Sequence, residues 1–256
     1  MLDSKNDILT HQSESNENSD SFRTTVKSID DTRCYFEERI DEVNEFFKYL
    51  EILSDRKTKI IQSDKKVHIE GDFLAILKSN GILLLYNLIE STVRFLIENI
   101  FHDISIRQCH FDELNSVFKE AIFKNLKDIS PENSIKRLLN VSFDIIQLGC
   151  NPKKDFSGNI DIRKIKEIGK KYGIIFRFQS LEADPNFSSE FKQNLQTVKI
   201  KRNDLSHGNL TFIECGKGTS LEKLNQYRQS TESSLRSLFG EIENYICEQG
   251  YLKENK

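Results

Sequence analysis

The sequence has no tryptophan, and only 3 prolines and 11 glycines stand among its 256 residues. Proline and glycine interrupt helices and mark turns, so their scarcity argues against a fold of many short strands. Apolar residues instead recur every three to four positions over long stretches of the chain. This spacing predicts an all-α protein.

Several classes of protein are excluded by what is missing. No apolar run approaches the roughly 18 residues of a membrane-spanning helix, and the first 30 residues hold no apolar core of a signal peptide. Phosphate-binding glycine loops, dinucleotide-binding glycine patterns and nucleophile elbows are also absent. We therefore expect a cytoplasmic protein that has no membrane attachment and belongs to none of those enzyme classes.

The five cysteines are widely scattered and odd in number, which indicates reduced thiols and no disulfide framework. The nearest approach to a metal site is the sequence cluster of His102, Cys109 and His110. No further carboxylate or thiol stands at ligand spacing beside it. We predict neither a metal site nor a cofactor.

Charge is distributed unevenly, although the formal net charge is only -3. Residues 1–55 contain 14 acidic and 6 basic side chains, whereas residues 153–202 contain 12 basic and 6 acidic ones. A local positive field attracts a polyanion such as RNA. The candidate RNA-binding residues are Arg163, Lys164, Lys170, Lys171, Lys199 and Lys201. The alternative is that the basic stretch only forms the solvated face of a helix.

Taken in order, the chain predicts a flexible lead-in over residues 1–20 and a single domain over residues 21–256. A first helix is expected over residues 22–50, with a break near Asp30 and Asp31, and a charged loop follows over 55–66. A buried central helix over 73–104 comes next, followed by a helix over 111–127, with Asp112 as its N-cap, and a helix over 130–148. The rest of the chain predicts a basic helix over 161–172 stopped by Gly173, a weakly alternating segment over 174–178, a helix over 189–207, a short hairpin or ordered loop over 210–218, and a last helix opened by Thr219 and Glu222. We expect residues 105–188 to be an insertion into a helical bundle.

The segment from Val198 to Phe212, V-K-I-K-R-N-D-L-S-H-G-N-L-T-F, combines an apolar stripe with polar chemistry. Continuing the stripe by four residues from Val198 places Arg202 on the face that meets the rest of the protein. A guanidinium there needs an anionic partner. Glu90 in the central helix is the candidate, and the alternative is that Glu90 pairs with Arg94 four residues on.

Residues 202–208, R-N-D-L-S-H-G, resemble the signature of HEPN domains, in which an Arg and a His are four to six residues apart. Residues 83–98, 157–174 and 211–214 resemble other recurrent segments of the larger, MAE-named HEPN subfamily. The resemblance runs from about residue 30 to the C-terminus. It implies an all-α, HEPN-like helical bundle with inserted helices and a short extended or hairpin element after the signature helix.

The resemblance also implies a metal-independent endoribonuclease that works as a homodimer, leaves a cyclic phosphate, and acts as a toxin or an anti-phage defence effector, with a possible antitoxin or defence partner. Its site residues would be Arg202 and His207, with Asn203, Ser206 and Glu90 in support. A histidine that titrates near neutral pH contributes about 10²- to 10⁴-fold as acid or base. An arginine supplies planar donors to phosphate oxygens. One motif holds one histidine for two proton transfers, so a dimer that apposes two motifs is expected.

Two simpler interpretations compete with catalysis. His207 before a helix-stopping glycine is also typical of a helix C-cap, and Arg202 on an apolar stripe is typical of an ion-paired or snorkelling side chain. The acidic first 55 residues motivate a second function, a non-enzymatic helical module that binds RNA or a protein partner. Position 209 is Asn, so the control by tyrosine modification known for HEPN toxins with an H-x-Y motif is not expected.

Overall fold

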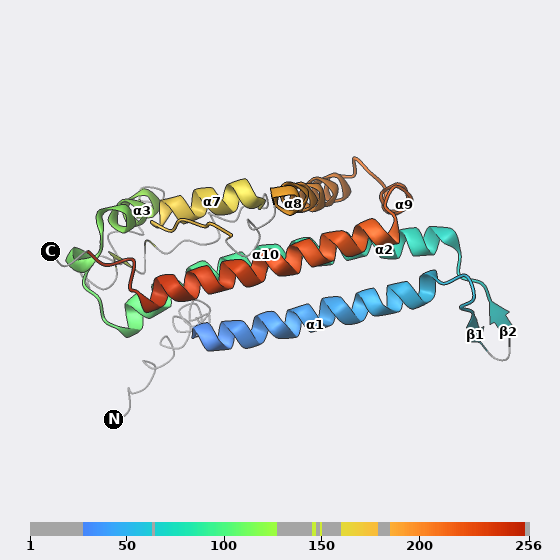
Figure 1. The fold of residues 1–256 in the computed structure, drawn as a ribbon, viewed down its shortest axis with the longest axis horizontal. Coiled ribbons are helices and arrows are strands. Elements are labelled where there is room, and N and C mark those ends of the chain that lie inside the picture. The colour runs from blue at the N-terminus through green and yellow to red at the C-terminus, as the bar shows by residue number, and fades with distance from the viewer. Residues whose placement is uncertain are drawn as a thin grey trace, which may run out of the picture.

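A computed structural model of the chain describes residues 28–62, 65–126, 145–146, 149, 160–178 and 185–253 (Figure 1). The elements are α1 (Ile29–Ser54), β1 (Ile60–Gln62), β2 (Lys65–Val67), α2 (Gly71–Ile106), the 3₁₀ turn η2 (Phe111–Glu113), α3 (Ser116–Leu126), α7 (Ile162–Lys171), α8 (Pro185–Ser206), α9 (Phe212–Lys217) and α10 (Leu221–Cys247). The predicted all-α class is confirmed. The predicted lead-in and most of the helix predicted over residues 130–148 lie outside the described residues.

The core of the fold is a bundle of α1, α2 and α10, in which α2 packs on both other helices and all three run along the length of the molecule (Figure 1). Helix α8 crosses this bundle and packs on both α2 and α10. Helix α1 runs antiparallel to α10, because Arg33 near the start of α1 pairs with Glu243 near the end of α10, and Glu51 near the end of α1 accepts a hydrogen bond from Asn225 near the start of α10. The central helix predicted over residues 73–104 is therefore α2.

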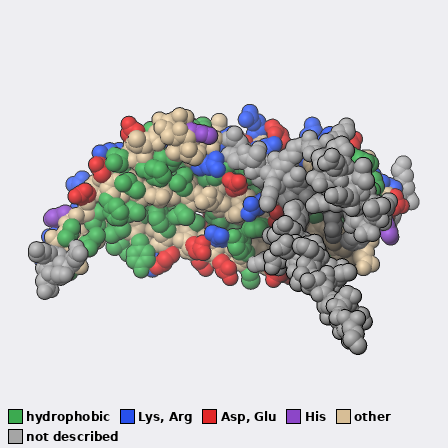
Figure 2. Space-filling view, turned by 180° about the vertical axis from the view of Figure 1, so that it is seen from behind, with side chains coloured by type: hydrophobic (Ala, Val, Ile, Leu, Met, Phe, Trp, Pro, Cys, Tyr) green, Lys and Arg blue, Asp and Glu red, His purple; other side chains and the backbone are tan. Residues whose placement is uncertain are grey.

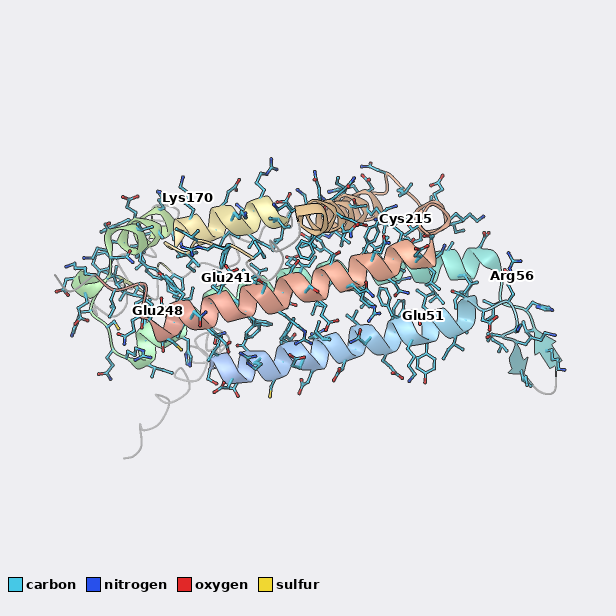
Figure 3. All side chains as sticks on the ribbon, viewed as in Figure 1. Glu51, Arg56, Lys170, Cys215, Glu241 and Glu248 are labelled. Carbon is cyan, nitrogen blue, oxygen red and sulfur yellow. The ribbon has the colours of Figure 1, made fainter. Side chains whose placement is uncertain are left out.

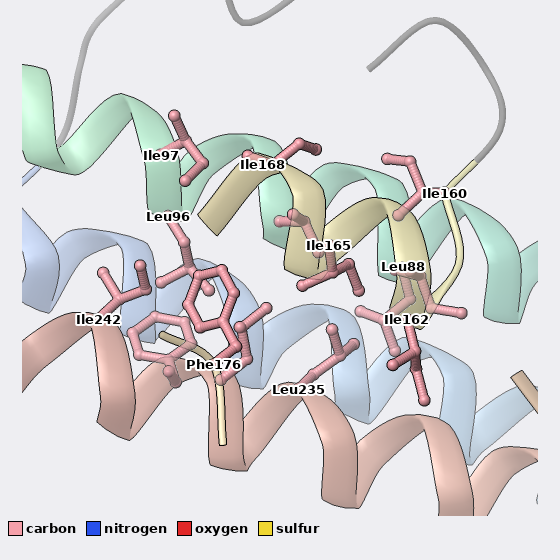
Figure 4. Packing of buried hydrophobic residues seen from close by; sticks show 14 of the residues in the cluster. Leu88, Leu96, Ile97, Ile160, Ile162, Ile165, Ile168, Phe176, Leu235 and Ile242 are labelled. Atoms are coloured by element: carbon pink, nitrogen blue, oxygen red, sulfur yellow. The ribbon is translucent and has the colours of Figure 1, made fainter. Parts of the chain in front are cut away.

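Helix α7 packs one apolar side on the half of the bundle that lies away from the β1–β2 hairpin (Figure 1). Ile162, Ile165 and Ile168, predicted to point inward, are buried against α2 and α10 (Figure 4). Asp161 caps the helix by accepting a hydrogen bond from the Lys164 N–H, and Gly173 ends it with a positive φ of 76°. Three-residue spacing of isoleucines thus fixes which side of α7 faces the core.

By length and composition alone, α2 could also cross a membrane, which differs from the expectation that the chain holds no such run. Among the residues that the structure describes, it is the one helix that meets this test. It contacts α1, α8, α9 and α10, and residues along its whole length are buried. A helix that is apolar nearly all round is expected at the centre of a bundle.

The first helix begins where a break was predicted. Ser28 Oγ accepts a hydrogen bond from the Asp31 N–H, and the Asp31 carboxylate accepts one from the Ser28 N–H. This capping box starts α1, so Asp30 and Asp31 occupy its first turn. Phe22, included in the predicted helix, lies outside the described residues.

The predicted loop over residues 55–66 contains a two-stranded antiparallel hairpin at the end of the bundle. Ile60 pairs with Val67 and Ile61 with Lys66. All four side chains are exposed, so the strands bury little apolar surface and left no clear alternating pattern to predict them from.

The segment after the signature helix is helical, and the predicted hairpin or extended element is wrong there. Thr211 Oγ1 accepts a hydrogen bond from the Glu214 N–H, and the Glu214 carboxylate accepts the Thr211 N–H, so a capping box opens α9. Two predicted caps are also wrong. Ser220, not Thr219, caps α10, and Asn115, not Asp112, accepts a hydrogen bond from the Phe118 N–H in the first turn of α3.

The alternation predicted over residues 174–178 is present as a pattern of burial without a partner strand. Ile174, Phe176 and Phe178 are buried, whereas Ile175 and Arg177 are exposed. The Glu241 carboxylate on α10 accepts the N–H groups of Arg177 and Phe178 at 2.8 and 2.5 Å (Figure 3). The Glu241 side chain therefore accepts N–H groups that would otherwise bond to a neighbouring strand.

Four cysteines belong to the described residues, and they fall into two pairs. Cys34 on α1 and Cys247 on α10 are exposed. Cys109 and Cys215 are buried, and burial raises the pKa of the Cys109 thiol. All four are free thiols, whereas Cys150 lies outside the described residues.

Candidate active site at the end of helix α8

The signature segment lies at the C-terminal end of α8, where a glycine stops the helix as predicted. Gly208 has a φ of 72°, a left-handed conformation that favours glycine. The N–H groups of Asn209 and Leu210 both reach the Asp204 carbonyl, at 2.9 and 3.3 Å. These bonds satisfy the last turn of the helix and turn the chain sharply toward α9.

Arg202 lies against α2, where the apolar stripe of α8 meets the bundle. Its guanidinium carbon is 4.3 Å from the centre of the Tyr86 ring, a cation–π distance. Its Nη2 lies 3.9 Å from Glu90 Oε2, and its Nη1 donates a 3.0 Å hydrogen bond to Asn203 Oδ1. The predicted pairing of Arg202 with Glu90 is therefore present, while the Arg94 guanidinium lies over Phe95.

Arg202 and Glu90 both keep access to solvent. Their side chains are 25% and 27% exposed, so the pair sits at the surface of the bundle. The Nη2–Oε2 distance of 3.9 Å is longer than a hydrogen bond, and Glu90 acts through this contact as a nearby negative charge. The Arg202 cation therefore has an aromatic and an acidic neighbour and remains accessible from water.

His207 stands one residue past the end of α8 and is exposed. Its N–H donates to the Asn203 carbonyl at 2.9 Å, which continues the helical pattern by one residue. Ser206, also exposed, donates its hydroxyl to the same carbonyl at 3.1 Å. Within one chain, Arg202 therefore packs on the bundle, while His207 lies exposed just past the end of α8.

A second charged contact lies one turn before Arg202 on α8. Lys199 Nζ is 2.7 Å from Asp161 Oδ2, at the start of α7, and these side chains are only 17% and 10% exposed. Burial of the Asp161 carboxyl raises its pKa, but the hydrogen bonds from Lys199 and from the Lys164 N–H outweigh that effect. The pKa of Asp161 therefore lies below its ordinary value.

The residues predicted to bind RNA divide by their surroundings. Arg163 and Lys170 are exposed on α7, and Lys201 on α8 is partly exposed. Lys199 is held by Asp161, Lys171 donates to Asn125 Oδ1 at 2.6 Å, and Lys164 lies 3.8 Å from Glu167. The surface available to a polyanion near α8 is therefore smaller than the count of basic residues indicated.

The remaining histidine cluster separates in the structure. His102 is partly exposed on α2, Cys109 is buried, and His110 is exposed before η2. Within the described ranges, no three His, Cys, Asp or Glu side chains gather in a group that could hold a metal ion.

A family comparison gives this site its context. The family model described as HEPN_MAE_28990/-like HEPN matches residues 7–251. The chain belongs to the HEPN family. No curated protein and no solved structure matches it. HEPN membership indicates a nuclease-like or RNA-related role.

The sequence did not assign two residues that build the site. Tyr86, whose ring packs against the Arg202 guanidinium, was given no role by the sequence. Asp161 holds Lys199 from 38 positions away in the chain. Tyr86 could have been found from its position four residues before Glu90, which places both side chains on one face of α2. Nothing in the sequence pointed to Asp161.

Proposed function

We propose that this HEPN protein is a metal-independent endoribonuclease that cleaves RNA through attack of the ribose 2'-hydroxyl, with a cyclic phosphate as product. The observation that carries the proposal is the end of α8, where a partly exposed Arg202 that packs on Tyr86 and an exposed His207 stand five residues apart. His207 would take the 2'-hydroxyl proton or protonate the leaving 5'-oxygen. Arg202 would stabilise the charge on the phosphorane oxygens.

The catalytic unit in this proposal is a homodimer, since one chain supplies one histidine for two proton transfers. Figure 2 supports a partner surface, because hydrophobic side chains gather on one half of the face seen from behind, bordered by charged ones. On α2, the partly exposed Ile76 and Leu83 precede Glu90 at intervals of seven residues, so all three face one side of the helix. A second copy that packed on this side of α2 would reach the Arg202–Glu90 pair and complete the site.

The test is cleavage of RNA and of matched DNA by the purified protein in the presence of EDTA. We expect RNA alone to be cut, and His207→Ala or Arg202→Ala to lower the rate at least about 100-fold. Lys192→Ala removes an exposed cation from the same helix and serves as the control. RNA cleavage that persists in both site variants would contradict the assignment of the site.

Such an activity would harm the cell that makes it, so we also propose a role as a toxin or defence effector under the control of a partner. Expression in a bacterium should slow growth, and His207→Ala should relieve that effect. Equal growth with both forms would count against a constitutively active toxin.

A second candidate function is a non-enzymatic module that binds a basic partner. The outward face of α1 favours it, because Glu38, Asp41, Glu42 and Glu45 are all exposed. This candidate predicts no cleavage by the wild-type protein, and binding to a basic protein that weakens when these four residues are changed to Gln or Asn.

A further inference from the structure

We propose that Tyr86 is a positioning residue that fixes Arg202 in the conformation used at the active site. This inference rests on the proposed ribonuclease function and adds a residue to it. Tyr86 touches the arginine and not the reacting atoms, so its expected contribution is to the placement of the guanidinium. The ring lies 4.3 Å from the guanidinium carbon, within the range of a strong cation–π contact.

Tyr86 can act as a platform because it is itself fixed. Its side chain is fully buried, and its hydroxyl oxygen accepts a 3.1 Å hydrogen bond from the Ile160 N–H. Burial raises the pKa of Tyr86, so the phenol is neutral at physiological pH. Because the Tyr86 ring is buried and its hydroxyl is hydrogen-bonded, the ring has a fixed position. The guanidinium that packs on its face therefore has little freedom to tilt.

The contacts around Tyr86 form a closed circuit through three helices. The Tyr86 hydroxyl on α2 accepts a hydrogen bond from the Ile160 N–H. The next residue, Asp161, is the N-cap of α7 and binds Lys199. Lys199 lies three residues before Arg202 on α8. Arg202 then returns to the Tyr86 ring. Two separate links from α8 to its surroundings therefore fix the same turn of the signature helix.

Two substitutions separate the ring from the hydroxyl. Tyr86→Leu keeps apolar volume but removes the aromatic face, whereas Tyr86→Phe keeps the face and removes the acceptor for Ile160. If the ring positions Arg202, Tyr86→Leu lowers kcat about 5- to 30-fold while KM changes less than about twofold. Tyr86→Phe stays within about threefold of wild type.

A matched control measures the effect of losing a buried tyrosine as such. Tyr251 is also fully buried, and its hydroxyl donates a 2.6 Å hydrogen bond to Asp103, at the opposite end of α2 from the hairpin. Tyr251→Leu should destabilise the fold to a comparable degree without a selective loss of kcat. An equal fall in kcat for Tyr251→Leu and Tyr86→Leu at full helicity would overturn the proposal.

The placement of Arg202 can be followed without any cleavage. The proton on Arg202 Nε should show a ring-current shift in NMR spectra, assigned by its loss in Arg202→Lys. The shift should disappear in Tyr86→Leu and persist in Tyr86→Phe and Tyr251→Leu. A shift unchanged in Tyr86→Leu would refute the proposal, whereas an inactive wild type with the expected shifts would refute the ribonuclease function alone.

Discussion

Lys199 on the signature helix lies 2.7 Å from the carboxylate of Asp161, the N-cap residue of α7. Asp161 does two things at once, since its other oxygen accepts the Lys164 N–H as the N-cap of α7. The pair thus joins the start of one helix to the turn of another that carries Arg202. Charged pairs with so little exposure are costly to break from one side, because the remaining charge is left without its partner.

Asp161→Asn should lower the free energy of unfolding by about 1–3 kcal/mol. Asn is as good an N-cap as Asp, so this substitution removes the charge and leaves the cap. Chemical denaturation at neutral pH measures the change. The control is Glu190→Gln, because Glu190 lies on α8 like Lys199 and forms a more exposed pair with Lys223 on α10. Loss of that pair should cost less than about 1 kcal/mol. Equal effects of the two variants would contradict the importance of the pair.

The same carboxyl group predicts how stability responds to acid. Because the pKa of Asp161 is lower in the folded than in the unfolded protein, its contribution is complete above the ordinary value near about 4 and is lost as the pH falls through the folded value. The difference in unfolding free energy between wild type and Asp161→Asn should therefore shrink below about pH 4. Denaturation curves at pH 7 and at several acid pH values test this. A difference that stays constant or grows in acid would disprove it.

Gly216 on α9 should not tolerate even a methyl group. A Cβ atom there would lie 1.9 Å from the backbone oxygen of Ala75 on α2, so the two helices would have to separate. We expect Gly216→Ala to destabilise the protein by about 3 kcal/mol or more. Gly240→Ala is the matched control, since a Cβ at that helical position meets nothing within 4 Å. Alanine there should stabilise α10 by about 0.5–1 kcal/mol, as read from thermal unfolding.

A site shared between two chains predicts interference by an inactive copy. Mixing wild type with a ninefold excess of His207→Ala and allowing subunits to exchange leaves about one tenth of the wild-type chains in homodimers. RNA cleavage should fall to about that level, with substrate kept in large excess. The same excess of an inert carrier protein is the control. Undiminished cleavage per wild-type chain would indicate a site that works within one chain.

The sequence predicted best those parts of the fold that depend on a helical apolar stripe. Helix α2 and the inward isoleucines of α7 follow directly from spacing, as does the stop at Gly208. The hairpin was missed because its strands are short and exposed, so no buried face marks them. Helix α9 was missed although Thr211 and Glu214 spell a capping box, because six residues hold too little periodicity to outweigh a turn prediction.

The candidate site was predictable only in part for a similar reason. The signature and the pairing of Arg202 with Glu90 could be inferred, because an arginine on an apolar stripe requires an acid on the facing helix. The ring of Tyr86 and the carboxylate of Asp161 depend on how three helices meet, and no local pattern encodes that arrangement. Contacts between distant segments are the part that needed a structure.

Because two of the described cysteines are exposed and two are buried, thiol labelling can follow the unfolding of the protein. A thiol reagent should modify Cys34 and Cys247 quickly in the native state, while Cys109 and Cys215 become reactive only when the helices around them part. Because Cys215 belongs to α9 and Cys109 follows the far end of α2, their labelling rates would report separately on the two ends of the bundle.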